Sequence, residues 1–243
     1  MIPHTPLRAT DAARFSHLVR GADLVIFDFD GVIADSEVIS LATLCTALKV
    51  FGIEMSPDAA RRQFLGQSMK SIEAYIDTHG SGDTETFAAV WEADLFARFA
   101  TELAPVRHAL DVVTALDALN KPYCIASSST HKRIGTALRA MGCTDRFAHI
   151  FSAQQVLRGK PAPDLFEFAA KNLGVSPARC LVVEDSPHGV RAAAAAGMRC
   201  AGFAGGQHVA GIENEHARLL KDHGADMVLF SYDGISDLLS SDA

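Results

Sequence analysis

Short, uninterrupted apolar runs recur along this chain, each three or four residues long and bounded by polar or turn-forming residues. Runs of this kind are typical of strands that are buried on both faces of a sheet. They are residues 24–27 (LVIF), 123–126 (YCIA), 149–151 (HIF), 180–183 (CLVV) and 227–230 (MVLF). Residues 202–206, which are rich in glycine, are expected to be a loop after a further strand.

Apolar residues at helical spacing fill the segments between these runs. They predict helices at residues 109–119, 165–173 and 189–197. Strands that alternate with helices predict βαβ units, and therefore a Rossmann-like α/β fold with a parallel, doubly wound sheet. Ligands bind such sheets at the carboxyl ends of the strands, so the residues that follow each run are the first candidates for a site.

Residues 35–104 interrupt this alternation, because the segment is long and contains no convincing strand. Three stretches in it repeat apolar residues at helical spacing: 41–51, 72–76 and 87–99. We expect an inserted helical domain here, with Trp91 in its core. Residues 22–34 and 105–243 then form the main domain, and residues 1–21 are an extension or short helix outside it.

Length and charge exclude some classes of function. A chain of 243 residues can form a main domain with a smaller insert. The net charge of −7 argues against duplex binding, because a nucleic-acid backbone requires a basic face, although a local basic pocket stays open. There is no apolar run of about 18 residues to cross a membrane and no apolar signal segment. A cytoplasmic enzyme is the default expectation, and five widely spaced cysteines are expected to be reduced core residues.

Two acidic pairs stand directly after two of the apolar runs. Asp28 and Asp30 point to the same side of an extended chain, and Gly31 lets the backbone turn sharply after them. Glu184 and Asp185 follow the fourth run. Each pair alone has an ordinary explanation, a strand-ending turn for the first and a helix N-cap for the second. Together, at one edge of a sheet, they favour an oxygen-rich site suited to Mg²⁺.

Two further features carry groups that bind anions. Ser127 and Ser128 begin a run of hydroxyl residues ahead of a predicted helix, although serine clusters also mark ordinary loops. Lys160 offers a cation from a loop stiffened by prolines, although a surface lysine is the more frequent finding. Neither feature assigns a function by itself.

The motifs stand in a fixed order: Asp28/Asp30, Ser127, Lys160 and Glu184/Asp185. This order resembles the four motifs of the haloacid dehalogenase superfamily, over residues 22–237. The forms Glu-Asp-Ser-x-x-Gly and Lys-Pro-x-Pro-Asp are similar to the branch that contains beta-phosphoglucomutase and its sugar-phosphatase relatives. In that branch a helical cap is inserted just after the first motif, and residues 35–104 match this cap in place and size.

The resemblance implies a role for each motif. Asp28 would be the nucleophile that becomes an aspartyl phosphate, and Asp30 the general acid that protonates the leaving oxygen and then activates water. Phosphate would be bound by Gly31, Ser127, Ser128 and Lys160, and Mg²⁺ by Asp28, the backbone carbonyl of Asp30, Asp185 and, directly or through water, Glu184.

Position 30 indicates the type of reaction. By the resemblance, phosphatases and mutases keep an aspartate there, whereas haloalkanoate dehalogenases and phosphonatases lack it. Beta-phosphoglucomutases also carry a hinge histidine and a cap arginine at positions that are Ser40 and Met69 in this chain. We therefore expect a Mg²⁺-dependent phosphatase that acts on a small phosphorylated metabolite, such as a sugar phosphate.

Some expectations concern the edges of the site. Gln67 and Lys70 are candidate specificity residues, because their loop aligns with the cap loop that approaches substrate, or they simply begin a solvated helix. Residues 31–37 and 100–105 are candidate hinges. The scattered histidines, His208 among them, are expected at the surface or as caps.

Two other functions stay open at this stage. A phosphosugar mutase would interconvert hexose phosphates with little net hydrolysis. A catalytically idle member would act as a binding or regulatory module and would form no phosphoenzyme. Sugar phosphates, 6-phosphogluconate-like acids and phosphoglycolate are all compatible substrates, and the oligomeric state is not readable from the sequence.

Overall fold

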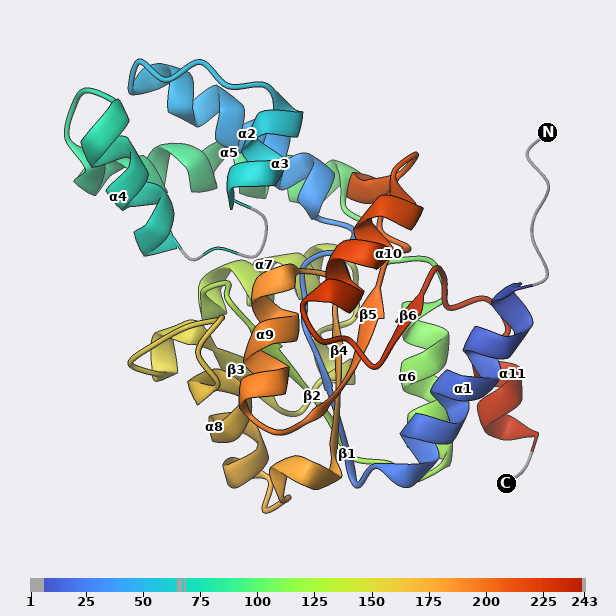
Figure 1. The fold of residues 1–243 in the computed structure, drawn as a ribbon. Coiled ribbons are helices and arrows are strands. Elements are labelled where there is room, and N and C mark those ends of the chain that lie inside the picture. Colours follow the sequence, from blue (N-terminus) through green and yellow to red (C-terminus); the bar gives the residue numbers. More distant parts are fainter. Residues whose placement is uncertain (1–6, 65–66, 68, 242–243) are drawn as a thin grey trace.

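A six-stranded parallel sheet forms the centre of the protein, with the strand order β3-β2-β1-β4-β5-β6 (Figure 1). The structure is a computed structural model that describes residues 7–64, 67 and 69–241. The strands are β1 (Leu24–Phe27), β2 (Tyr123–Ser127), β3 (Ile150–Ser152), β4 (Cys180–Glu184), β5 (Arg199–Phe203) and β6 (Met227–Leu229). The predicted fold class, a doubly wound α/β sheet, is confirmed.

Strand β1 lies inside the sheet, between β2 and β4, and its side chains alternate between two apolar cores. Val25 and Phe27 pack in one core, and Leu24 and Ile26 pack in the other. All four residues are fully buried. The strand needs an unbroken apolar run because helices cover both of its faces.

The helices divide into two layers, one on each face of the sheet (Figure 1). On one face lie α1 (Leu7–Gly21), α6 (Ala109–Ala118), α7 (His131–Ala140) and α11 (Ile235–Ser240). On the other lie α8 (Asp164–Asn172), α9 (Pro187–Ala195) and α10 (Glu213–Asp222). Short 3₁₀ helices occur at η1 (Thr84–Thr86), η2 (Thr144–Arg146), η3 (Ala153–Gln155), η4 (Pro177–Arg179) and η5 (Gln207–Val209).

Helix α1 packs into the apolar core of the main domain. Phe15 and Val19, one helical turn apart, are fully buried in the same apolar core as Val25. The helix also packs against β6 and α11, so the first and last helices lie side by side. Residues 1–6 of the predicted extension lie outside the described residues, and its boundary at residue 21 stays a prediction.

Strand β5 is the further strand expected before residue 202, but it was not among the located apolar runs, because exposed Arg199 and Gly202 break its apolar pattern. Gly202 lies inside this strand and not in the predicted loop. A Cβ at Gly202 would lie only 3.0 Å from the Leu220 side chain, so α10 packs closely over the strand at this point.

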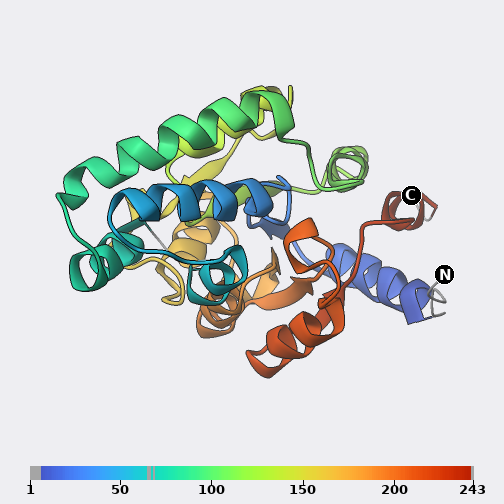
Figure 2. The ribbon, with the colours of Figure 1, turned by 90° about the horizontal axis from the view of Figure 1, so that it is seen from above.

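Four of the helices between β1 and β2, all of them before α6, gather beyond the carboxyl ends of the strands (Figure 1). They are α2 (Glu37–Val50), α3 (Pro57–Phe64), α4 (Met69–His79) and α5 (Phe87–Glu102), here called the inserted helices. Helices α2 and α5 run alongside each other (Figure 2), and Trp91 Nε1 donates to Thr43 Oγ1 at 2.9 Å across them. Helix α3 was not predicted, because Ala60 and Phe64 are its only buried side chains.

The two chain segments that lead to and from the inserted helices lie against each other. Ala34 forms an isolated bridge with Pro105, and Asp35 N donates to Ala104 O at 3.0 Å. The two predicted hinges therefore meet at one place, although hinge motion itself stays a prediction.

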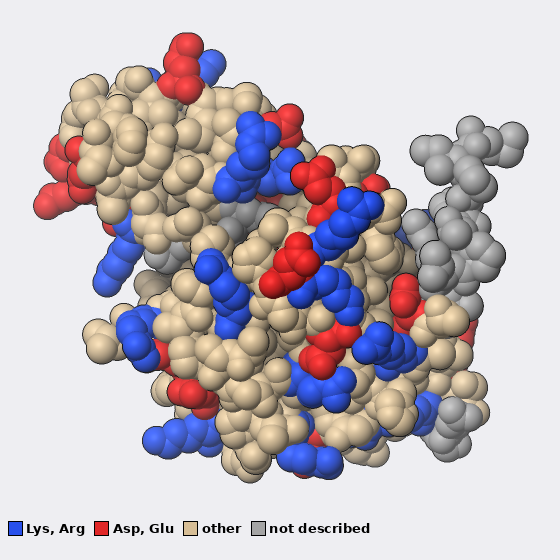
Figure 3. All heavy atoms as spheres, viewed as in Figure 1, with Lys and Arg blue, Asp and Glu red and all other residues tan. Residues whose placement is uncertain are grey.

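The distribution of surface charge and the state of the cysteines are as the sequence indicates. Acidic and basic side chains are interspersed on the face shown in Figure 3. All five cysteines are buried and free, as predicted. Within the described part of the chain, every helix is too short or too polar to cross a membrane.

Candidate active site

Three neighbouring strands deliver polar residues to one edge of the sheet. Asp28 directly follows β1, Ser127 ends β2, and Glu184 ends β4 with Asp185 next to it. All four line a cavity that lies between this edge and the inserted helices. Residues that are up to about 157 positions apart thus meet because the parallel strands end together.

The acidic residues form a compact cluster. Carboxylate oxygens of Asp28, Glu184 and Asp185 lie within 4.8 Å of one another, and all three residues are buried. Burial raises the pKa of Asp28 and of Asp185, and the neighbouring carboxylates raise both further. Such a cluster favours a cation, which would offset the repulsion between the carboxylates.

The donor atoms of the cluster fit a small, hard divalent ion. Asp185 Oδ2 is buried and makes no hydrogen bond, so it keeps lone pairs that a cation could use. Carboxylate oxygens without any nearby cysteine in the cluster are the ligand set that suits Mg²⁺ or a similar cation.

Lys160 lies within this cluster and is no surface lysine. Its Nζ is 2.6 Å from Asp28 Oδ1 and 2.6 Å from Glu184 Oε1, and only 1% of its side chain is exposed. Burial disfavours its charge, but the two carboxylates outweigh this effect and raise the pKa of Lys160. The lysine therefore stays cationic beside the carboxylate of Asp28.

Glu184 is held by donors on both of its oxygens. Oε1 accepts from Lys160, and Oε2 accepts from the backbone N and the hydroxyl of Ser186 at 2.7 and 2.9 Å. A Cβ at Gly189 would lie 1.6 Å from Glu184 Oε1, so only glycine fits there. Because its lone pairs are largely used, Glu184 is less available to a metal than Asp185 is.

Gly31 and His208 enclose the carboxylate of Asp185. Gly31 has a positive φ of 77°, and a Cβ on it would lie 1.9 Å from Asp185 Oδ2. His208 Nε2 lies 3.2 Å from the same oxygen, and burial lowers the pKa of His208. The expectation that His208 is a surface or capping residue was wrong, because a tertiary contact between η5 and the end of β4 buries it.

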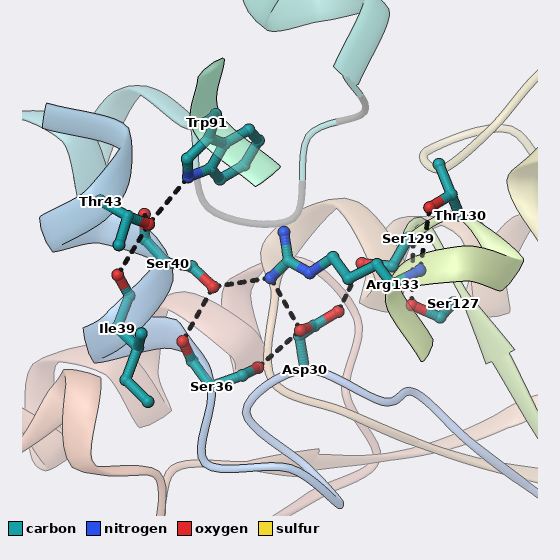
Figure 4. Close-up of polar contacts among 10 residues, drawn as sticks. All are labelled: Asp30, Ser36, Ile39, Ser40, Thr43, Trp91, Ser127, Ser129, Thr130 and Arg133. Atoms are coloured by element: carbon teal, nitrogen blue, oxygen red, sulfur yellow. Dashed lines mark hydrogen bonds and ion pairs between the residues drawn. The ribbon is translucent and has the colours of Figure 1, made fainter. Parts of the chain in front are cut away.

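Asp30 is not part of the acidic cluster, and its carboxylate lies among Ser36, Ser129 and Arg133 (Figure 4). Its Oδ1 accepts from Ser36 Oγ at 2.5 Å and from Arg133 Nη2 at 2.8 Å, and its Oδ2 accepts from Ser129 Oγ at 2.6 Å. Burial favours the neutral acid, but Arg133 and the two hydroxyls hold the pKa of Asp30 below its ordinary value. Its side chain is thus separate from the predicted metal ligands, and ligation through its backbone carbonyl stays a prediction.

The hydroxyl run forms the turn between β2 and α7. Ser127 is buried, and its Oγ accepts from Ser129 N at 3.0 Å. Ser128 lines the cavity. Thr130 caps α7 by accepting from Arg133 N at 3.2 Å, so the run ends at a helix N-terminus that faces the site.

Of the two candidate specificity residues, the structure brings only Gln67 to the cavity. Lys70 is exposed and does not line the cavity. Residues 66 and 68 of the same loop lie outside the described residues. Trp91 is 5% exposed, as expected for a core residue of the inserted helices, but it also lines the cavity.

Arg133 was not predicted at the site, Ser129 was expected only as part of the hydroxyl run, and Ser36 and Glu37 were expected only as parts of a hinge. Ser36, Ser129 and Arg133 hydrogen-bond to Asp30, and Glu37 lines the same cavity. Burial and the nearby charge of Asp30 raise the pKa of Glu37 to about 8. The helical pattern after Thr130 could have placed Arg133 in the first turn of α7, but the direction of its side chain depends on tertiary packing.

A doubly wound sheet with clustered carboxylates, a buried lysine and a hydroxyl turn at the strand ends has the parts of a metal-assisted phosphoryl-transfer site. The family model described as haloacid dehalogenase-like hydrolase matches residues 25–203. The chain therefore belongs to the haloacid dehalogenase-like hydrolase family, as the motif order predicted.

Several known proteins are similar to this chain. The 6-phosphogluconate phosphatase of Escherichia coli strain K12 is 29% identical over 76% of this chain and 84% of its own length. The beta-phosphoglucomutase of Bacillus subtilis strain 168 is 27% identical over 78% of this chain and 86% of its own. A solved haloacid dehalogenase-like protein of Agrobacterium tumefaciens strain C58 is 34% identical, covers 91% of this chain and 99% of its own, and gives a TM-score of 0.71.

Proposed function

We propose that this protein is a Mg²⁺-dependent phosphatase that hydrolyses a small phosphorylated metabolite through an aspartyl phosphate on Asp28. One observation carries the proposal: three buried carboxylates lie within 4.8 Å of one another, and the Lys160 ammonium lies 2.6 Å from Asp28 in the same cavity. The family and its named phosphatase relatives support the same class of enzyme.

Asp28 acts as the nucleophile in this mechanism. A bond forms between its carboxylate oxygen and phosphorus while the bond from phosphorus to the ester oxygen breaks, and Asp30 gives its proton to that oxygen. Water then attacks the phosphorus of the aspartyl phosphate, passes a proton to Asp30 and releases Asp28 with inorganic phosphate. Because Arg133 favours the ionised form of Asp30, this aspartate must take up a proton before the first step.

Charge compensation is the other requirement, since an anionic nucleophile meets an anionic phosphoryl group. Lys160, Gly31, Ser127 and Ser128 would bind the phosphoryl oxygens. Asp28, Asp185 and the Asp30 carbonyl would hold Mg²⁺, with Glu184 acting directly or through water. The bound cation would supply positive charge next to the phosphoryl oxygens.

We also propose that residues 35–104 form a cap domain over a core of residues 22–34 and 105–243. The contacts between the two connecting segments, with Ala34 bridged to Pro105, support hinges at residues 31–37 and 100–105. A cap of this kind would control the access of water to the aspartyl phosphate.

Hydrolysis is favoured over phosphosugar mutation. Ser40 stands where the mutases carry a histidine, and its hydroxyl is already engaged by the backbone of Ser36 and by Arg133. A sugar phosphate or a phosphorylated sugar acid is the proposed class of substrate, in line with the 6-phosphogluconate phosphatase relative. A cytoplasmic location stays a prediction.

The test is the initial rate of phosphate release from a panel of phosphorylated metabolites, with Mg²⁺ and then with EDTA. We expect release that requires the metal, and a loss of at least about 1,000-fold in Asp28→Asn. Asp23→Asn is the matched control, because Asp23 stands at the opposite end of β1 in an exposed pair with Arg179. Its rate should equal that of the unmodified protein.

An alkali-labile phosphate on Asp28 in rapidly quenched enzyme would support the intermediate. Interconversion of hexose phosphates without net phosphate release would indicate a mutase instead. A metal-loaded protein that never forms the phosphoenzyme would refute both enzymatic functions and indicate a binding module.

A further inference from the structure

Arg133 enters the cavity from the first turn of α7 and reaches the inserted helices (Figure 4). Only 12% of its side chain is exposed. Its guanidinium lies over the Trp91 ring, 5.5 Å from the centroid, and its Nη2 donates to Ser40 Oγ at 2.7 Å. Contacts with α2 and α5 therefore fix the guanidinium at one place in the cavity.

The guanidinium has more donors than the protein uses. Nη2 makes both of its hydrogen bonds, to Asp30 Oδ1 and to Ser40 Oγ. Nε is buried and has no partner. Since a guanidinium carries five N–H donors, three of them have no acceptor among the described residues. A buried donor without an acceptor is unfavourable, so this arrangement is suited to a ligand that brings one.

The two cations of the cavity occupy different positions relative to the reaction. Among the described residues that line it, only Lys160 and Arg133 carry a positive charge. Lys160 is engaged by Asp28 and Glu184, at the nucleophile. Arg133 contacts Asp30, which the proposed mechanism places at the leaving oxygen. Arg133 is thus adjacent to the leaving group and Lys160 to the transferred phosphoryl group.

We propose that Arg133 determines substrate specificity by binding a second anionic group on the leaving-group part of the phosphoester. The donors that Asp30 and Ser40 leave free would donate hydrogen bonds to a carboxylate or a second phosphate, whose charged oxygens are strong acceptors. The preferred substrates are small phosphoesters in which this anion lies a few bonds from the ester oxygen. This inference rests on the proposed phosphatase function.

The test measures binding without turnover, in the Asp28→Asn background. Isothermal titration gives the Kd of phosphoglycolate against ethyl phosphate, and of a hexose 1,6-bisphosphate against the hexose 1-phosphate. We expect the second anion to tighten binding by at least about tenfold, and Arg133→Met to abolish this preference. Arg133→Lys, which keeps the charge without the planar fork, should keep only part of it.

Lys132→Met is the matched control. Lys132 precedes Arg133 in α7 and also reaches the inserted helices, through Glu92 at 2.6 Å, but its side chain is 68% exposed and does not line the cavity. The variant removes the same charge and a similar bridge, so the preference should stay unchanged in it.

The two pairs of ligands show which kind of second anion Arg133 binds. A preference within the phosphoglycolate pair alone assigns a carboxylate, and one within the hexose pair alone assigns a second phosphate. The inference is overturned if Arg133→Met weakens binding equally for the member with the second anion and the member without it in each pair, since Arg133 would then only position Asp30. Failure of the phosphatase proposal would appear separately, as no phosphate release by the unmodified enzyme.

Discussion

Two lysine–carboxylate pairs in this protein share one distance but differ in burial. Lys160 Nζ lies 2.6 Å from both Asp28 and Glu184 with 1% of its side chain exposed, whereas Lys132 Nζ lies 2.6 Å from Glu92 with 68% exposed. The same substitution by methionine at each lysine therefore isolates the effect of burial on an ion pair.

The expected losses of stability differ severalfold. Removing one partner of a buried pair costs about 3–5 kcal/mol, because it leaves a buried charge without compensation. An exposed pair contributes about 0–1 kcal/mol. We expect Lys160→Met to lower the free energy of unfolding by about 3 kcal/mol at pH 7.5, the lower end of the buried range, because the released carboxyls can take up protons. For a chain of this size that corresponds to a fall in Tm of about 6–12 °C.

The pH dependence supplies a second check with a definite sign. Burial raises the pKa of Asp28, and without Lys160 nothing opposes this effect. In the variant the native state then binds more protons than the unfolded state does, so its stability falls as pH rises. The loss of unfolding free energy in Lys160→Met should therefore be small at pH 5 and should grow towards pH 8.

Urea unfolding in EDTA, followed by circular dichroism, measures these quantities. The double variant Lys160→Met/Glu184→Gln should recover part of the loss, because it removes one of the two carboxylates that the lysine leaves unpaired. The reasoning is refuted if Lys160→Met and Lys132→Met lose equal stability, or if the deficit of Lys160→Met does not change between pH 5 and pH 8.

Two further predictions concern neighbours of the acidic cluster. Gly31→Ala should weaken Mg²⁺ binding at least about tenfold, because the new Cβ would lie 1.9 Å from Asp185 Oδ2. Gly174→Ala is its control, since Gly174 has a similar positive φ of 69° and open space around it, so it should show only the backbone cost of about 1–2 kcal/mol; Mg²⁺ titrations that give equal affinities for both variants would contradict the prediction. Glu37→Gln should make stability in EDTA less dependent on pH between about 5 and 8. The pKa of Glu37 is raised to about 8, so the folded state binds the extra proton in this range, and stability falls by up to about 1.4 kcal/mol per pH unit as pH rises. Urea unfolding at a series of pH values measures the slope, and identical slopes for the variant and the unmodified protein would exclude this role of burial.

Much of the fold could be predicted because its signals are local. The run at residues 24–27 is apolar at every position, and a strand covered on both faces requires such a run. The bounds of strand β5 could not be predicted, because exposed Arg199 and closely packed Gly202 interrupt the same signal. Glycine suits position 202 because α10 packs closely over the strand there, and this contact comes from a separate segment of the chain.

Some features of the candidate site could likewise be predicted from the sequence, and others could not. The carboxylates of Asp28 and Asp185 could be expected at one place, since parallel strands end at a common edge. Lys70 could not be separated from Gln67 by sequence, because only tertiary packing decides which of two nearby polar side chains lines the cavity and which is exposed.

By itself, the sequence determined which residues are candidates for the chemistry, since acidic pairs, hydroxyl runs and proline-rich loops can each be recognised within a few positions of the chain. Only the tertiary structure decided what surrounds them. His208 lies against Asp185, and Arg133 reaches Asp30, Ser40 and Trp91, because separate elements pack together around the cavity. Packing sets the direction, the burial and the partners of a side chain, and none of these three follows from its neighbours along the chain.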